Sequence, residues 1–279
     1  KGPERVSGAV LPFRSIVAGT AVLGVLVSVA SMVMMASAMS GELDLAQLRP
    51  HIEMMVVEMD VGRAWVVRIV VLVFAGLAMM LNQRAPGFSL LVAAIAGGIA
   101  LGSLAWNGHG AMDEGSRRFW HFTTDILHLL AAGAWLGALV AFAWMARRDM
   151  LQTEESIKLL ARTVTRFESV GALIVVAITV TGVVNYLFIV GPKFDVLLPS
   201  TYGKLLIIKV MLFAGMLMLA ARNRFHLGPL LERSFREGKY RVAASALRRS
   251  VLVELSTAFF IVGLVAWLGT LSPEMGIAS

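Results

Sequence analysis

Two histidines and an aspartate share one face of a predicted helix. His121, Asp125 and His128 are spaced by four and three residues, and at about 100° per helical residue they project from a single stripe. Imidazole and carboxylate groups bind metal ions, and ionisable groups at the edge of an apolar segment usually mark a site or pathway. His121 and His128 differ by about 10 Å in helix rise, too far for both to hold one ion through bonds of about 2 Å. The stripe therefore predicts two adjacent sites or successive stations, completed by ligands from other elements.

A histidine shortly before this stripe is the best source of a further ligand. His109 lies between Gly108 and Gly110, so the backbone around it can approach another element closely. For His109 and the stripe together, the alternative interpretation is hydrogen bonding at the membrane interface without a metal.

Thioether side chains gather nearby along the chain. The further candidate ligands are His51, Met35, Met39, Met54, Met55 and Met59. The chain has no cysteine, and imidazole with thioether suits copper in an oxidising compartment, because thioethers favour Cu(I) and imidazole binds both Cu(I) and Cu(II). Calcium or magnesium would require a cluster of oxygen ligands. Methionine also fills gaps in apolar helices, so packing is the alternative role for these residues.

The elements that must position these residues are membrane helices. The chain has 279 residues, 58% hydrophobic and 15% charged, whereas soluble domains carry about a quarter charged residues. A spanning helix needs about 20 apolar residues, and the period-two alternation of a membrane barrel is missing. We therefore expect an all-α fold, a polytopic transmembrane helical bundle forming one domain over residues 1–279. Its seven spans are predicted at 15–38, 64–81, 88–106, 120–146, 168–190, 203–221 and 250–270.

The segments between spans carry their own signals. Residues 40–63 have apolar residues at helical spacing and predict an amphipathic helix on the outer membrane surface. Residues 147–167 and 222–249 predict short amphipathic connecting helices, too short for a nucleotide-binding domain. Gly98 and Gly102, and again Gly133 and Gly137, form small-residue faces for close helix packing. Glu254, inside the last span, can pair with Arg248 or Arg249, with a proton or ion role as the alternative.

Charge indicates orientation and excludes some partners. Placing the N-terminus in the cytoplasm puts most of the 25 Lys and Arg residues on that side, as the positive-inside rule requires, and leaves the C-terminus outside. The net charge of +7 therefore reflects the basic residues that gather on the cytoplasmic side of the membrane. Because the basic residues form no continuous face, the pattern excludes nucleic-acid binding and leaves the lipid bilayer as the surrounding partner.

The stripe and its surroundings resemble a known family. The run Asn107-Gly108-His109-Gly110, followed by His121-xxx-Asp125-xx-His128-Leu129-Leu130-Ala131-Ala132-Gly133-Ala134-Trp135-Leu136-Gly137, is similar to the G-H and H-L-x-A-A-x-W-x-G-x-L signature of the copper resistance protein D family. The resemblance continues through Thr181-Gly182-Val183-Val184-Asn185, a block at 201–209, Asn223-Arg224 and Glu254. It covers most of residues 60–273.

The resemblance implies a bacterial inner-membrane protein that takes up or transports copper from the periplasmic side and contributes to copper homeostasis or resistance. Such proteins have about eight spans and are often encoded beside a small periplasmic copper-binding protein of the CopC type. The family's first span does not precede Lys1 in this sequence, so we expect a helix upstream, and the C-terminus is expected to be periplasmic. We expect no enzymatic activity. The alternatives are an electron-transfer protein with b-type haem between histidines of separate spans, and a copper-binding sensor without transport.

Overall fold

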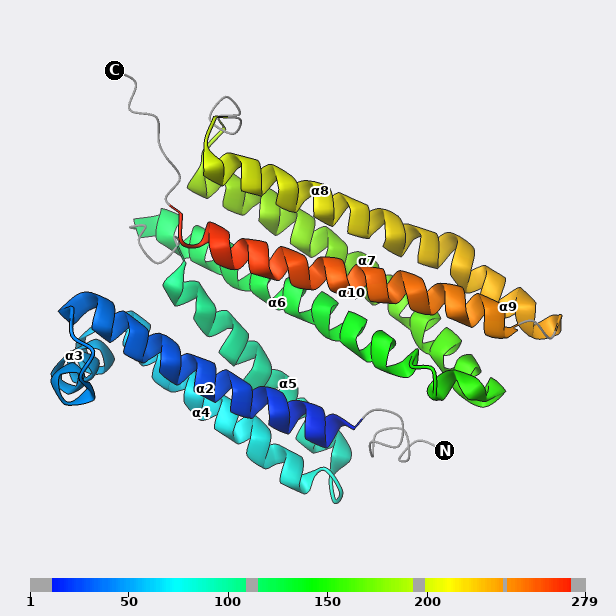
Figure 1. Cartoon of the computed structure of the whole chain (residues 1–279), viewed down its shortest axis with the longest axis horizontal. Coiled ribbons are helices and arrows are strands. Elements are labelled where there is room, and N and C mark those ends of the chain that lie inside the picture. The colour runs from blue at the N-terminus through cyan, green and yellow to red at the C-terminus, as the bar shows by residue number, and fades with distance from the viewer. Residues whose placement is uncertain (1–11, 109–114, 193–198, 238–239, 272–279) are drawn as a thin grey trace. The chain divides into compact units, whose positions relative to one another are not determined.

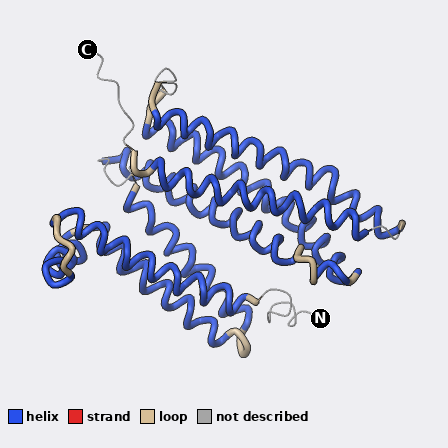
Figure 2. Tube along the Cα trace, in the orientation of Figure 1, coloured by secondary structure: helices blue, strands red, loops and turns tan. Residues whose placement is uncertain are grey.

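The computed structural model describes residues 12–108, 115–192, 199–237 and 240–271, and the regular structure in these ranges is helical (Figures 1 and 2). Seven of the described helical segments are long and apolar enough to cross a membrane. This finding confirms the expected all-α, polytopic transmembrane bundle. The segments are Phe13–Ser40, Asp60–Leu81, Pro86–Asn107, Gly115–Met145, Glu154–Ile189, Thr201–Phe235 and Tyr240–Leu268.

The chain divides into two compact units, with the boundary after Leu130. The N-terminal unit contains α4 (Asp60–Ala78) between its neighbours α2 (Phe13–Ser40) and α5 (Pro86–Gly102). Short 3₁₀ helices extend two of these elements: η1 (Met79–Leu81) follows α4, and η2 (Ser103–Asn107) follows α5. The first half of α6 (Gly115–Met145) completes this unit.

The predicted amphipathic segment between the first two spans forms the helix α3 (Leu45–Glu58). Asp44 caps it, because its Oδ1 accepts a hydrogen bond from the Ala46 amide at 3.0 Å. The apolar face of α3 packs against α2 and α4, where Leu48 and Met55 are buried beside Trp65. The helix is thus confirmed, and much of its apolar face lies against protein. Its position on the outer membrane surface stays a prediction.

The C-terminal unit is built around the second half of α6. It contains α7 (Glu154–Ile189), α8 (Thr201–Arg222) and α10 (Tyr240–Leu268), with α10 packed on both α7 and α8. Trp135 and Leu139 of α6 form a core with Ile178, Met216 and Ala258. The 3₁₀ helix η4 (Met150–Gln152) precedes α7, and the π-helical turn η5 (Asn223–Leu227) and the short α9 (Gly228–Arg236) connect α8 to α10.

Two helices extend beyond their predicted spans. We expected spans from 168 and 250 with separate connecting helices before them, whereas α7 begins at Glu154 and α10 at Tyr240. Thr153 caps α7, since its side chain accepts a hydrogen bond from the Ser156 amide at 3.3 Å. No proline interrupts either extension, so the helical hydrogen bonds continue from the polar turns into the apolar span. Hydropathy marks the apolar part of such a helix and misses its polar start.

Met55 should contribute to folding stability. It is 0% exposed in its cluster, and truncating a buried methionine to alanine costs about 2–5 kcal/mol because a cavity remains. We expect Met55→Ala to lower the thermal unfolding midpoint of the detergent-solubilised protein. Met39→Ala is the matched control, because Met39 is 46% exposed and its change should leave the midpoint nearly unaltered. Equal midpoints for the two variants would contradict this packing role.

Candidate functional site

His121, Asp125 and His128 lie on α6, in its first half, as the spacing predicts. His121 is 2% exposed, whereas Asp125 and His128 are half-buried. Ionisable side chains are rarely buried in an apolar protein without a structural or functional reason. The stripe is therefore directed largely toward protein.

The carboxylate of Asp125 lies against the backbone of Gly108. A Cβ atom added to Gly108 would be 2.7 Å from Asp125 Oδ2, which is closer than nonbonded atoms allow. Added Cβ atoms on Gly102 and Gly98 would meet Ile126 at 3.5 Å and Leu130 at 3.7 Å. The segment from α5 to Gly108 thus runs beside the first half of α6, and the small-residue face predicted at Gly98 and Gly102 is confirmed as a packing face. The close packing predicted at Gly137 is wrong among the described residues, because a Cβ added there meets nothing within 4 Å.

A buried arginine holds the 3₁₀ helix η2 that leads to Gly108. Arg68 of α4 is 6% exposed. Its Nε donates a hydrogen bond to Ser103 Oγ at 2.8 Å, and its Nη2 donates one to the Ser103 carbonyl at 2.9 Å. At the other end of η2, the Trp106 ring meets the Phe122 ring edge-on at 4.4 Å. The residues before position 109 are therefore attached to both α4 and α6. Sequence analysis missed this role of Arg68, because no local pattern pairs it with Ser103.

The junction between α3 and α4 lies near the start of α6. Asp60, the first residue of α4, forms two ion pairs. Its Oδ2 lies 3.4 Å from Arg118 Nη2 of α6, and its Oδ1 lies 3.7 Å from Arg63 Nη1. These side chains are largely exposed, so each pair contributes little stability. Their position still matters, because Met59 precedes Asp60 and His121 follows Arg118 by three residues. One proposed thioether ligand is thereby brought near the end of the stripe.

The remaining predicted ligands are dispersed. His109 lies outside the described residues. Met35 and Met39 are exposed on α2, and Met54 is half-buried on α3. His51 of α3 directs its Nδ1 toward the Gln47 carbonyl at 3.4 Å. Across the part of the chain that the structure describes, no three His, Asp or Glu side chains are grouped to hold a metal ion, and the ligand roles stay predictions.

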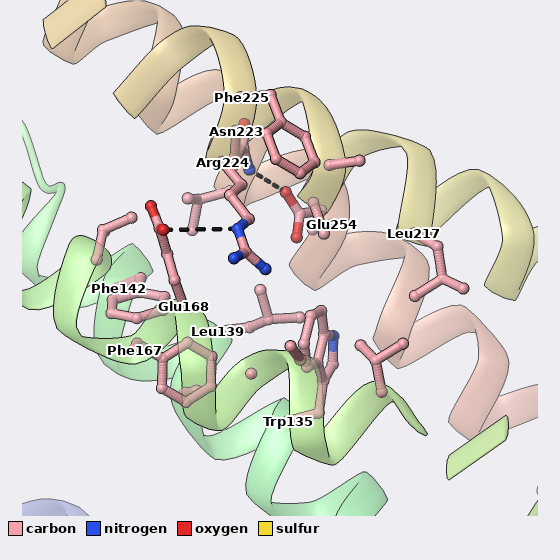
Figure 3. A pocket seen from close by; sticks show the side chains of 18 of the residues that line it. Trp135, Leu139, Phe142, Phe167, Glu168, Leu217, Asn223, Arg224, Phe225 and Glu254 are labelled. Atoms are coloured by element: carbon pink, nitrogen blue, oxygen red, sulfur yellow. Dashed lines mark hydrogen bonds and ion pairs between the residues drawn. The ribbon is translucent and has the colours of Figure 1, made fainter. Parts of the chain in front are cut away.

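A second polar group lies in the C-terminal unit. A cavity of about 360 Å³ is lined mainly by apolar side chains, with Glu168, Arg224, Asn223 and Glu254 at one end (Figure 3). Arg224 Nε lies 3.5 Å from Glu168 Oε2, and Asn223 Nδ2 donates a hydrogen bond to Glu254 Oε1. The expected pairing of Glu254 with Arg248 or Arg249 is absent from the salt bridges of the described residues. Its partner instead comes from the π-helical turn η5.

Comparison with known proteins resolves the family. Residues 3–119 match the model of the copper resistance protein D-like N-terminal domain, and residues 161–268 match that of copper resistance protein D. Over 275 residues the chain is 53% identical to copper resistance protein D of Pseudomonas syringae pv. tomato, which covers 99% of this chain and 89% of that protein. The chain belongs to the copper resistance protein D family. The predicted family and its association with copper handling are confirmed.

More distant relatives share parts of the chain. Inner membrane protein YebZ of Escherichia coli (strain K12) is 29% identical over 64% of this chain and 59% of its own length. Copper transport protein CutJ of Bacillus subtilis (strain 168) is 31% identical over 42% of this chain and 21% of its own length. No solved structure matches the chain. The two segments matched by the family models lie on opposite sides of the boundary between the compact units.

A side chain at position 108 should displace the Asp125 carboxylate. Gly108→Ala would place a methyl group against the Asp125 carboxylate, and overpacking of this kind costs about 1–3 kcal/mol. We expect a lower unfolding midpoint in detergent. Gly97→Ala on α5 is the matched control, because a Cβ there meets nothing within 4 Å and alanine favours helix. A Gly108→Ala protein as stable as Gly97→Ala would contradict the expected destabilisation and show that the Asp125 carboxylate moves aside without cost.

Proposed function

We propose that this protein binds copper ions at the end of α6 that carries His121 and takes them up, or transports them, across the bacterial inner membrane. The observation that carries the proposal is the close approach of Gly108 to Asp125. Because His109 is the next residue along the chain, this approach supports a site that combines His109 with the stripe of α6. Membership of the copper resistance protein D family supports copper as the substrate.

The chemistry of these residues suits a copper ion in transit. Neutral imidazoles of His109, His121 and His128 bind both Cu(I) and Cu(II), and the Asp125 carboxylate can serve as a ligand or as an acceptor that orients an imidazole. The helix rise of about 10 Å between His121 and His128 favours successive stations over one shared site. The exposed or half-buried residues Met35, Met39, Met54 and Met59 then supply weaker thioether ligands on the approach, and His51 supplies an imidazole.

Orientation follows from charge. The excess of Lys and Arg on the side of the N-terminus favours a cytoplasmic location for that side, which places the start of α6 and the C-terminus on the periplasmic side. The name of the relative in Escherichia coli, an inner membrane protein, supports the same membrane. In this orientation the site faces the compartment in which a small CopC-type protein would deliver copper. The proposed role is binding and transfer of copper, without catalysis.

The name of one relative favours transport over sensing as the proposed role. The partial match in Bacillus subtilis is named a copper transport protein. Since the chain includes no nucleotide-binding loop of the G-x-x-x-x-G-K-[ST] type, the proposed movement uses an ion gradient, either of copper itself or of a second ion.

Copper binding should depend on the stripe. We expect purified wild-type protein to bind Cu(I) or Cu(II), and the double variant His121→Ala/His128→Ala to lose at least about tenfold in affinity, as loss of metal ligands or their supporting partners typically costs. Titration followed by metal analysis gives both values. His226→Ala, in η5 of the C-terminal unit, is the control and should bind as the wild type does.

Two results would contradict the proposed function. Copper affinity unchanged in the double variant would remove the stripe from the site, provided that the variant stays monodisperse in detergent. A Soret absorption band in the purified wild type would indicate haem held by histidines instead.

A further inference from the structure

A carboxylate lies in the interior of the C-terminal unit with no cation of the described residues within ion-pair distance. Glu254 of α10 is 2% exposed, and its hydrogen-bond partner is the neutral amide of Asn223. Among the described residues, no Lys, Arg or His nitrogen lies within 4.0 Å of its carboxylate. Burying an ionised carboxylate without a cation is so costly that such a group takes up a proton or binds a cation.

The charges around the cavity favour a proton. The ionisable residues that line it are Glu168 from α7, Arg224 from η5 and Glu254 from α10, whereas the lining residues of α6 and α8 are apolar and α9 contributes none. Arg224 and Glu168 form an ion pair whose charges cancel. The three groups together are therefore neutral only when Glu254 carries a proton. Oxygen atoms suitable for a bound metal cation are few in a lining that is otherwise apolar.

Asn223 can bind both forms of Glu254. Its Nδ2 donates to the carboxylate, while its Oδ1 is buried without a hydrogen-bond partner among the described residues. Rotation of the amide would present Oδ1 as an acceptor for the O–H of the protonated acid. Asn223 also begins the π-helical turn η5, a type of irregularity that is frequent at functional sites.

The Arg224 side chain can move toward Glu254 when Glu254 loses its proton. In Figure 3 its guanidinium lies between the carboxylates of Glu168 and Glu254, and the side chains of Arg224 and Glu168 are partly exposed. The polar end of the cavity thus contains both a partly exposed ion pair and a buried acid. These side chains offer the polar partners that a water molecule needs, and the cavity volume of about 360 Å³ leaves room for water that could carry a proton.

We propose that Glu254 is a proton-binding site through which copper movement is coupled to a proton gradient. A hydronium ion at the cavity transfers a proton to the Glu254 carboxylate, so that one hydronium O–H bond breaks, a carboxylic O–H bond forms, a water molecule is left, and Arg224 stays paired with Glu168. Loss of that proton to water restores the carboxylate, toward which the Arg224 guanidinium turns. The coupling, but not the proton site itself, rests on the proposed copper transport.

The proton site is tested first without copper. Infrared spectra of the copper-free protein should show the carbonyl stretch of a protonated, buried carboxylic acid, and this band should be lost in Glu254→Gln. Glutamine keeps the shape and a hydrogen bond to Asn223 but exchanges no proton. Glu232→Gln, an exposed acid of α9, is the matched control and should retain the band. A wild type without the band, or a Glu254→Gln protein that keeps it, would overturn the proton site.

Coupling is tested in proteoliposomes with the membrane potential clamped. For one proton per copper ion, a pH difference of one unit should shift the steady-state copper ratio across the wild-type membrane about tenfold, since one pH unit is a tenfold proton ratio. The Glu254→Gln protein should show no shift, and Glu232→Gln should behave as wild type. An equal shift in Glu254→Gln would overturn the coupling. Absence of copper flux in the wild type would overturn the proposed transport, while the infrared band still decides the proton site.

Discussion

A charged side chain in the apolar layer must find its partner within the protein, and this constraint organises both units. Arg68 and Glu254 are buried ionisable residues, and each is bound by neutral groups of another element, Ser103 and Asn223. Ser103 begins the 3₁₀ helix η2, and Asn223 begins the π-helical turn η5. Each buried ionisable side chain thus meets a partner that lies where regular α-helix ends, because a change of helical winding redirects side chains and backbone carbonyls toward it.

This arrangement gives Arg68 a positioning role. Its two hydrogen bonds hold the start of η2 on α4, and the ring contact of Trp106 holds the end of η2 on α6. Between them they bring Gly108 onto the Asp125 carboxylate. The end of the described segment before position 109 is thus fixed against α6 by contacts from two different helices.

Hydropathy and helical period predicted the spans and the shared face of His121, Asp125 and His128, because both signals are local. The contacts that hold the sites are not local. Arg68 and Ser103 are 35 residues apart, and Asn223 and Glu254 are 31 residues apart, so no periodicity relates them. Glu254 was expected to pair with Arg248 or Arg249 because only neighbours along one helix can be judged from sequence. Likewise, the exposed or buried state of each methionine depends on which helix faces it, as the burial of Met55 against Trp65 illustrates.

The helix α6 belongs to both units, since it runs unbroken from Gly115 to Met145 across their boundary after Leu130. Its first half carries the proposed copper stripe, and its second half contributes Trp135, Leu139 and Phe142 to the cavity that contains Glu254. The regular hydrogen bonds of a continuous helix restrict the φ and ψ angles that a loop would use to absorb a displacement. If copper binding changes the position of the stripe, we therefore expect α6 to be the element that conveys the change to the cavity, and the proton and copper sites need not share a ligand to be coupled.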